Sequence, residues 1–277
     1  MKNEHKITKS LDNKNFVGDF KDREFVSEKG ILYIAFGDAF TKEGIMSYLS
    51  LRRHCPDIPV CFMTDNLDTL GDIEDENLLK ITIKPTHIRS KVDYVFNSPF
   101  KKTLYLDSDT VIVRNIEDIF ESLERFDVAL THDYARKRTK YSNLIPEYSK
   151  IPYAFSEVNG GVFAFNCNER TQKFLELWRH YFYKYFRQTN GWDQVSLRIS
   201  LWESDVSMFH LPFEYNIRSK ANREKQDRFK HEFGEQHMSP RIYHLHYDSE
   251  VHHGKFKYKE EDLDEFTEAI VKESVWY

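Results

Sequence analysis

The first strong signal in the sequence is a strand, a helix and a second strand in close succession. The apolar run 31–36 (Ile-Leu-Tyr-Ile-Ala-Phe) stops at Gly37, which is typical of a buried strand. Thr41 can cap a helix that ends near Pro56, and a second apolar strand follows at 58–64. Because such crossovers are right-handed and join parallel strands, this unit predicts a parallel sheet in the core.

Strands and helices go on alternating along the chain, without a linker rich in Gly, Pro or Ser and without an internal repeat. Apolar runs predict further strands at 79–83, 103–106, 110–113, 127–131, 162–165, 207–211 and 241–245. Helical spacing of apolar residues predicts helices at 170–187, 193–202 and 258–273. We therefore expect one doubly wound α/β domain, whose ligands bind beyond the carboxyl ends of the strands.

The ends of the chain differ in character from its centre. Residues 1–28 are polar and predict an N-terminal arm, and residues 29–257 are expected to form the α/β domain. Residues 258–277 predict a C-terminal helix that packs on the domain or extends it. Residues 1–28 lack an apolar signal-peptide core, and nowhere do about 18 apolar residues run together, so we expect no transmembrane segment.

Charge and cysteine usage narrow the class of protein. The formal net charge of −5 at pH 7 argues against a general nucleic-acid or anionic-membrane binder, although peripheral membrane contact stays compatible with it. The three cysteines are scattered and fit neither a zinc pattern nor a disulfide framework. We expect reduced thiols and a cytoplasmic location.

Asp107-Ser108-Asp109 lies between two apolar runs that predict strands. Side chains at i and i+2 of an extended segment share one side, so both carboxylates can converge on one point. Two close carboxylates repel each other unless a cation lies between them. Mn²⁺ or Mg²⁺ would bind both and use its remaining positions for phosphate oxygens and water.

Two alternatives stay open for this motif on the residues alone. Asp107 and Asp109 could cap a turn between two strands, as aspartates commonly do. The same sequence motif also occurs near the start of the haloacid-dehalogenase-like phosphatases. In such an enzyme the first aspartate, here Asp107, would be the nucleophile, and Asp109 would be a general acid. Those enzymes normally place the motif on their first strand, whereas a complete strand-helix-strand unit precedes it here.

Further segments accompany this motif along the chain. They are 91–95 (Lys-Val-Asp-Tyr-Val), 157–166 (Glu-Val-Asn-Gly-Gly-Val-Phe-Ala-Phe-Asn), 191–194 (Gly-Trp-Asp-Gln) and 242–244 (Ile-Tyr-His). In order and spacing the chain resembles the glycogenin- and galactosyltransferase-like retaining glycosyltransferases of family 8, over about residues 30–257. The resemblance implies a single GT-A-type domain with a Rossmann-like mixed central sheet flanked by helices.

The resemblance also assigns roles to residues. It implies that Asp107, Asp109 and His244 bind Mn²⁺ (or Mg²⁺), and that Asp193 and Gln194 act beside the reactive carbon. It implies contacts to the nucleotide-sugar donor from a larger set: Ala35, Phe36, Asp65, Lys91, Ser108, Asn159, Gly160, Gly161 and Lys255.

Each of these residues also has a simpler interpretation. His244 could be a structural histidine at a strand end, or part of a zinc site with His246, His252 and His253. Asn159-Gly160 is a hairpin-turn signal, Asp193 and Gln194 suit the first turn of a helix, and Lys91 could be a surface lysine.

The function expected from the resemblance is transfer of a hexose from a nucleotide-diphosphate sugar to an acceptor hydroxyl. By resemblance the donor is a UDP-sugar, the reaction retains configuration and Mn²⁺ is required. The acceptor would be a glycan, a lipid-linked molecule or a protein, and residues 132–157, basic first and aromatic later, would form its wall. A phosphatase with Asp107 as nucleophile and a non-catalytic nucleotide-sugar or glycan-binding protein are the alternatives.

Overall fold

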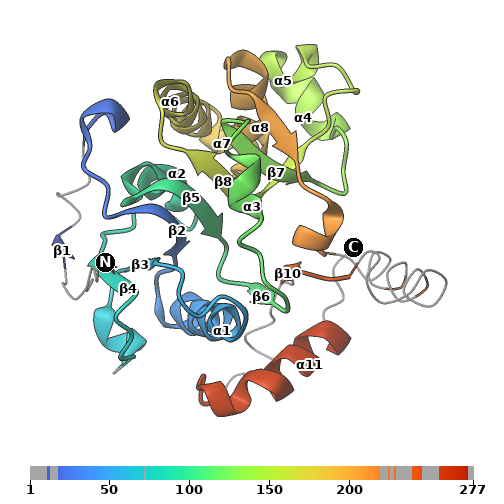
Figure 1. Cartoon of the computed structure of the whole chain (residues 1–277). Coiled ribbons are helices and arrows are strands. Elements are labelled where there is room, and N and C mark those ends of the chain that lie inside the picture. The colour runs from blue at the N-terminus through green and yellow to red at the C-terminus, as the bar shows by residue number, and fades with distance from the viewer. Residues whose placement is uncertain are drawn as a thin grey trace.

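A mixed β-sheet forms the centre of the protein, as the computed structural model shows (Figure 1). The structure describes residues 11–12, 18–71, 73–218, 224, 228, 239–244 and 256–273. The strands of the large sheet are β1 (Leu11–Asp12), β2 (Ser27–Ile34), β3 (Val60–Thr64), β4 (Leu78–Thr82), β5 (Phe100–Leu106), β7 (Val128–His132), β8 (Val158–Asn166) and β9 (Met208–His210). Within the described residues these eight strands lie in the order β1-β4-β3-β2-β5-β8-β7-β9. The predicted α/β fold with a mixed central sheet is confirmed.

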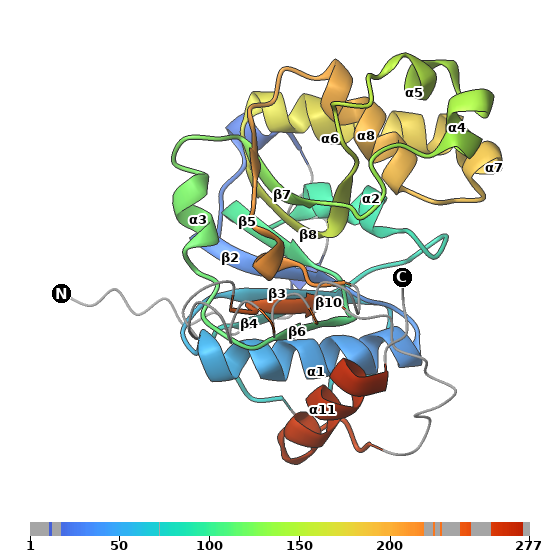
Figure 2. The ribbon, with the colours of Figure 1, turned by 90° about the vertical axis from the view of Figure 1, so that its right-hand side faces the viewer.

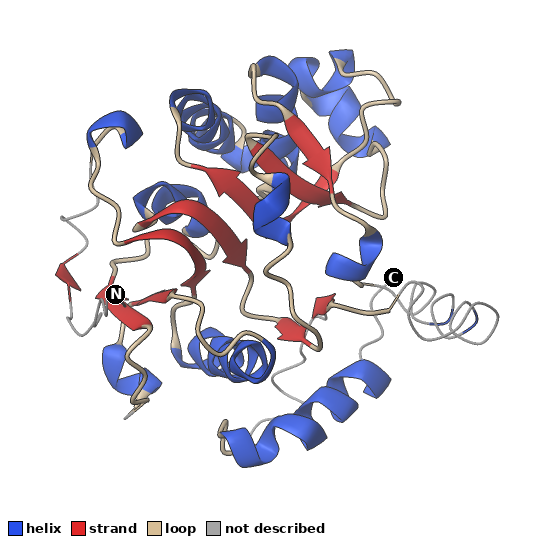
Figure 3. Cartoon of the chain, viewed as in Figure 1, coloured by secondary structure: helices blue, strands red, loops and turns tan. Residues whose placement is uncertain are grey.

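Helices cover both faces of this sheet (Figure 3). The α-helices of the described residues are α1 (Asp38–His54), α2 (Lys91–Tyr94), α3 (Ile119–Ser122), α4 (Thr139–Leu144), α5 (Pro146–Lys150), α6 (Glu169–Lys184), α7 (Phe186–Thr189), α8 (Gln194–Glu203) and α11 (Leu263–Glu273). Figure 2 shows α1 and α11 on one side of the sheet and α6 and α8 on the other. No helix in the described part of the chain is long and apolar enough to span a membrane.

Alternation along the strands explains the two faces. Leu32 and Ile34 of β2 pack in one buried cluster with the apolar face of α6, including Trp178. Ile31 and Tyr33 point to the other side and pack in a second cluster with α1. Because both faces are covered, β2 is apolar throughout its buried part, which is why its sequence predicts a strand so clearly.

The predicted strand-helix-strand unit is confirmed, since β2 and β3 pair in parallel across α1. The helix begins at Asp38, earlier than the Thr41 cap predicts. Gly37 precedes it with φ +72°, a conformation that glycine adopts freely. Thr41 is buried instead, and its hydroxyl lies 3.1 Å from that of Thr64, so it joins the helix to β3.

The antiparallel half of the sheet carries an irregularity that matters for the site. β8 pairs antiparallel with both β5 and β7. On β7, Leu130 lies opposite Phe163, but the next residue, Thr131, lies opposite Asn159. Residues 160–162 therefore bulge out of register. Asn159-Gly160 lies inside β8, so the hairpin-turn interpretation is wrong.

A second, two-stranded sheet lies beside α1. It pairs β6 (Thr110–Ile112) with β10 (Ile242–His244) in antiparallel fashion, with His244 opposite Thr110. The apolar face of α11, including Leu263 and Phe266, packs in one cluster with Met46 of α1 and Val111 of β6. This small sheet brings the end of β10 to the segment that directly follows β5.

Candidate functional site

Two cavities meet at the carboxyl ends of β2 and β5, where an open α/β sheet is expected to bind its ligands. The first cavity has a volume of about 250 Å³ and lies against Ala35 and Phe36 at the exit of β2. The second has a volume of about 380 Å³ and lies against Asn159 and Asp193. Arg89, Lys91 and Asp107 line both cavities. They mark the junction between the two.

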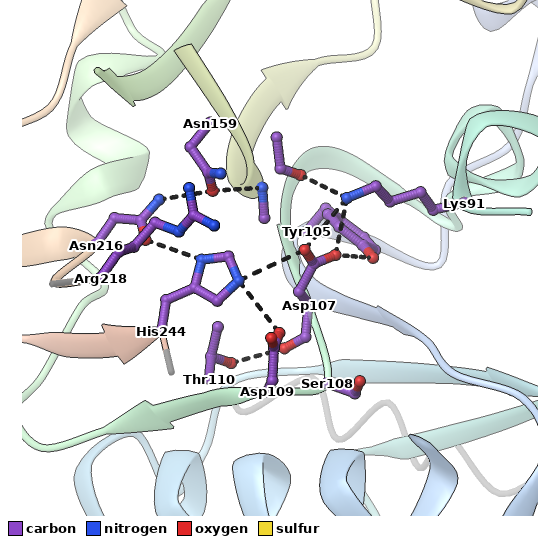
Figure 4. A network of polar contacts seen from close by, with 12 residues as sticks. Lys91, Tyr105, Asp107, Ser108, Asp109, Thr110, Asn159, Asn216, Arg218 and His244 are labelled. Atoms are coloured by element: carbon purple, nitrogen blue, oxygen red, sulfur yellow. Dashed lines mark hydrogen bonds and ion pairs between the residues drawn. The ribbon is translucent and has the colours of Figure 1, made fainter. Parts of the chain in front are cut away.

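Asp107, Asp109 and His244 come together at this junction (Figure 4). Nε2 of His244 lies 3.1 Å from Oδ1 of Asp109 and 3.6 Å from Oδ2 of Asp107. Ligand atoms of all three lie within 4.8 Å of one another. The pairing of β6 with β10 accounts for this, because it places His244 opposite Thr110 and hence beside the aspartates.

The chemistry of these three groups fits a divalent cation. Two carboxylates suit Mn²⁺ or Mg²⁺, and an imidazole nitrogen is an additional ligand that Mn²⁺ accepts. The hydroxyl of Thr110 donates to the carbonyl of Asp107 over 2.8 Å and closes the turn. The simpler interpretation has the two aspartates cap this turn, but the Thr110 hydroxyl already closes it.

Lys91 lies buried beside Asp107 rather than on the surface, so its interpretation as a solvated lysine is wrong. Its Nζ donates to Oδ1 and Oδ2 of Asp107 over 3.0 and 3.2 Å, and it lies 3.4 Å from Oδ2 of Asp193. The hydroxyl of Tyr105 also donates to Oδ1 of Asp107, over 2.5 Å.

These contacts set the protonation of the junction. Burial works to raise the pKa of Asp107, but the Lys91 ammonium, His244 and the Tyr105 hydroxyl outweigh it, and the pKa lies below its usual value. Burial works to lower the pKa of Lys91, and the carboxylates of Asp107 and Asp193 raise it above its usual value. The junction therefore holds a carboxylate and an ammonium at neutral pH.

Asp193 occupies the N-cap position of α8, but its side chain makes no capping hydrogen bond. Its carboxylate turns instead to Lys91 and to Arg89, whose Nε lies 3.7 Å from Oδ1. Gln194 donates from Nε2 to Oε2 of Glu157 over 3.4 Å. Asp193 and Gln194 both line the second cavity, a place that capping alone does not explain.

The bulged segment of β8 packs against the aspartate and histidine side chains. A methyl group placed on Gly161 would lie 2.2 Å from Cε1 of His244 and 2.5 Å from Oδ2 of Asp107. The backbone N–H of Asp107 donates to the carbonyl of Gly161 over 2.8 Å. Oδ1 of Asn159 accepts from the N–H of Gly161 over 3.0 Å, within the same strand. Only a glycine lets β8 pass this close to the cluster.

The first cavity has an apolar mouth and an acidic wall. Phe40 and Ile88 line it and are 42% and 64% exposed, which leaves apolar surface free at its mouth. Ser108 lines it too and donates to Oε2 of the buried Glu43 over 3.4 Å. Burial raises the pKa of Glu43 well above its usual value, and the nearby Asp109 adds to the effect.

One predicted residue, Asp65, lies outside both cavities, and another, Lys255, cannot be placed. Asp65 lines neither of the two cavities, and its Oδ1 accepts a hydrogen bond from the N–H of Gly37 over 2.9 Å. Lys255 lies outside the described residues. The same is true of His246, His252 and His253, the further ligands of the alternative zinc site.

Several residues of the site were not predicted. Arg89 and Tyr105 lie two positions from Lys91 and Asp107, and strand alternation could have indicated Tyr105. The others have no local sequence signal and come from segments that only the fold brings close: Glu43, Asn216 and Arg218.

The sequence matches the family described as nucleotide-diphospho-sugar transferase over residues 101–263, which is more than half of the chain. An active-site mutant of LgtC has a similar structure, with a TM-score of 0.60 at 14% identity over 88% of this chain and 96% of that one. The galactosyltransferase LgtC in complex with donor and acceptor sugar analogues gives 0.56 at 14% identity, with the same coverage.

Mouse xyloside xylosyltransferase 1 in its apo form gives a TM-score of 0.53 at 12% identity, over 78% of this chain and 97% of that one. At such identities the likeness is one of fold, and that fold is the GT-A fold of glycosyltransferases. No curated protein in the comparison matches the sequence.

Proposed function

The chain belongs to the nucleotide-diphospho-sugar transferase family, and from this premise we propose that it moves a hexose from a UDP-sugar to an acceptor hydroxyl with retention of configuration. Membership of this family makes it a glycosyltransferase and leaves the phosphatase alternative without support. The observation that carries the finer proposal is the cluster of Asp107, Asp109 and His244 at the junction of two cavities.

Asp107, Asp109 and His244 would hold the divalent cation, and the mixture of carboxylates with an imidazole favours Mn²⁺ over Mg²⁺. A bound cation would offset the negative charge that builds on the departing nucleoside diphosphate. The first cavity, on the β2 side of the junction, suits the nucleoside, with Phe36, Phe40 and Ile88 around the base.

The sugar would then lie in the second cavity. Lys91 stands between the carboxylates of Asp107 and Asp193, so its ammonium can contact the donor where phosphate and sugar join. Positive charge develops on the sugar during transfer, and the carboxylate of Asp193 and the amide of Gln194 are placed to stabilise it. Lys255 stays a proposed diphosphate ligand.

The far wall of the second cavity would receive the acceptor. The guanidinium of Arg138 lies 4.3 Å from the ring centre of Trp192 and 5.0 Å from that of Tyr134. Arg138 is paired with the buried carboxylates of Asp133 and Glu157, at 3.1 and 3.2 Å. Because its charge is already balanced, this wall suits a sugar ring stacked on the aromatic side chains better than an anionic group. We propose a glycan acceptor, free or attached to a lipid or protein, and a cytoplasmic location.

The test is release of nucleoside diphosphate from a panel of UDP- and GDP-sugars, with Mn²⁺ or with a chelator. We expect turnover of a UDP-sugar with Mn²⁺ alone and its loss in Asp107→Asn, whereas the control Asp38→Asn, an exposed aspartate paired with Lys42, keeps it. The anomeric configuration of the transferred sugar, measured by NMR, tests retention. Binding without turnover of any donor would favour the non-catalytic alternative and overturn the proposal.

A further inference from the structure

Asn216 is a buried residue that no sequence signal singled out, and it bonds directly to His244. Its Oδ1 lies 2.9 Å from Nδ1 of His244 (Figure 4). Its Nδ2 lies 2.9 Å from Oγ1 of Thr131 and 2.9 Å from Oδ1 of Asn159. Both ends of the Asn216 amide are therefore used, one by β10 and the other by β7 and β8.

The orientation of these amides follows from one backbone group. The N–H of Gly161 can only donate, so the atom of Asn159 that it contacts over 3.0 Å must be the amide oxygen. That oxygen can only accept, so the atom of Asn216 beside it must be the amino nitrogen. The other end of Asn216 is then its oxygen, and Nδ1 of His244 must carry the hydrogen that it accepts.

In the neutral imidazole, a hydrogen on Nδ1 leaves Nε2 unprotonated, so that its lone pair can act as a ligand. Nε2 is the atom that faces the carboxylates of Asp109 and Asp107, at 3.1 and 3.6 Å. We infer that Asn216 is a positioning residue that fixes the tautomer and the ring plane of His244, so that Nε2 is ready to bind the cation. The inference rests on the proposed metal-dependent function.

The backbone keeps Asn216 in place for this task. The next residue, Ile217, donates its N–H to the carbonyl of Ile242 and accepts from the N–H of His244, both over 2.9 Å. These bonds tie the segment of Asn216 to β10, so the amide and the imidazole move together. Metal-binding histidines commonly have such a partner on the second nitrogen, and its loss typically weakens metal binding about 10- to 100-fold.

The other end of Asn216 reaches the second cavity. Both lone pairs of the Asn159 oxygen are used, by Gly161 and by Asn216. Asn159 lines that cavity, so the group it can offer there is its amino group, a hydrogen-bond donor. Asn216 thus links the orientation of the proposed metal ligand to the orientation of an amide that lines the cavity proposed for the sugar.

Substitutions at Asn216 can test separately the roles of its amide oxygen, which contacts His244, and of its amino group, which contacts Asn159. Asn216→Leu removes both, and we expect it to weaken Mn²⁺ binding about 10- to 100-fold, measured by electron paramagnetic resonance of free Mn²⁺. Asn216→Asp keeps an acceptor for His244 and should bind Mn²⁺ within a few-fold of the wild type. It also places a second acceptor against the Asn159 oxygen, so the KM for the donor should rise. Asn143→Leu, at an exposed position of α4, is the control.

A second measurement needs no variant at Asn216. Long-range ¹H–¹⁵N NMR of the metal-free protein, at a pH where the ring is neutral, identifies which nitrogen of His244 carries the hydrogen; the signal is assigned by its absence in His244→Gln. We expect hydrogen on Nδ1. Hydrogen on Nε2 would overturn the inference, even if Asn216→Leu does not fold.

The outcomes separate this inference from the proposed function. If the wild type binds no Mn²⁺ in the presence of UDP, the metal-dependent function fails, whatever the NMR shows. If the wild type binds Mn²⁺ and a folded Asn216→Leu binds it equally well, the function stands and the role of Asn216 is refuted.

Discussion

Replacing Gly161 by alanine should disable the cation site without unfolding the protein. The added methyl carbon would lie 2.2 Å from Cε1 of His244 and 2.5 Å from Oδ2 of Asp107. The methyl group and these two side chains must therefore move apart by about 1 Å to reach ordinary van der Waals contact near 3.5 Å. Gly161 does not have a positive φ, so the backbone tolerates alanine and the clash is the main cost. Overpacking of this kind costs about 1–3 kcal/mol of folding free energy.

Metal sites tolerate displacements of about 0.2 Å, whereas a misplacement of about 1 Å in a catalytic constellation can cost on the order of 100-fold in rate. We therefore expect Gly161→Ala to lose Mn²⁺ affinity and donor turnover by on the order of 100-fold. Paramagnetic resonance of Mn²⁺ and release of UDP measure the two effects, and circular dichroism checks the fold.

Gly160→Ala is the matched control for Mn²⁺ affinity, because its methyl group would meet the flexible Cδ2 of Leu197 at 3.1 Å and neither His244 nor Asp107. A folded Gly161→Ala protein with the Mn²⁺ affinity of the wild type would refute the placement of β8 against the cluster.

Two further predictions concern buried carboxylates. Asp127 accepts hydrogen bonds from Arg170, Ser207 and Asn168, which lower its pKa to about 2. Because this pKa lies below that of the unfolded chain, the ionised Asp127 adds about 2 kcal/mol to the free energy of unfolding at neutral pH. That stability is lost as the pH falls from about 4 to 2. Urea unfolding of Asp127→Asn should lack that part of the acid dependence, and an unchanged dependence would contradict it. Burial raises the pKa of Glu43, so the folded protein should lose stability as the pH rises from about 4.3, the unfolded value, toward the folded pKa. Glu43→Gln should match the wild type in stability at pH 3 and exceed it at pH 7, and an equal difference at both pH values would contradict a raised pKa for Glu43.

Local patterns predict the centre of the fold well. The runs that become β2 and β3 are apolar without interruption because helices cover both faces, and a parallel pair needs the helix between them. The start of α1 is harder to predict from the sequence. Thr41 has the chemistry of a cap, but in the fold its hydroxyl bonds to Thr64, a contact that depends on the packing of α1 against β3.

In the candidate site too, some residues can be predicted from the local sequence and others depend on the fold. Asp107 and Asp109 are two residues apart, so their convergence is visible locally. The approach of His244 depends on the pairing of β10 with β6, across more than a hundred residues. The bulge at Gly160 and Gly161 arises from the register between β7 and β8, and no sequence pattern reports register of that kind. The roles assigned to Asp193, Gln194 and the donor-binding residues stay predictions.

The most direct test of the account is the coupling between UDP and Mn²⁺ on the wild-type protein, measured by isothermal titration calorimetry. If Asp107, Asp109 and His244 hold a cation that also binds the diphosphate, Mn²⁺ should tighten UDP binding, and UDP should tighten Mn²⁺ binding by the same factor. Asp109→Asn should abolish this coupling. Equal UDP affinity in Mn²⁺ and in a chelator would contradict the central claim.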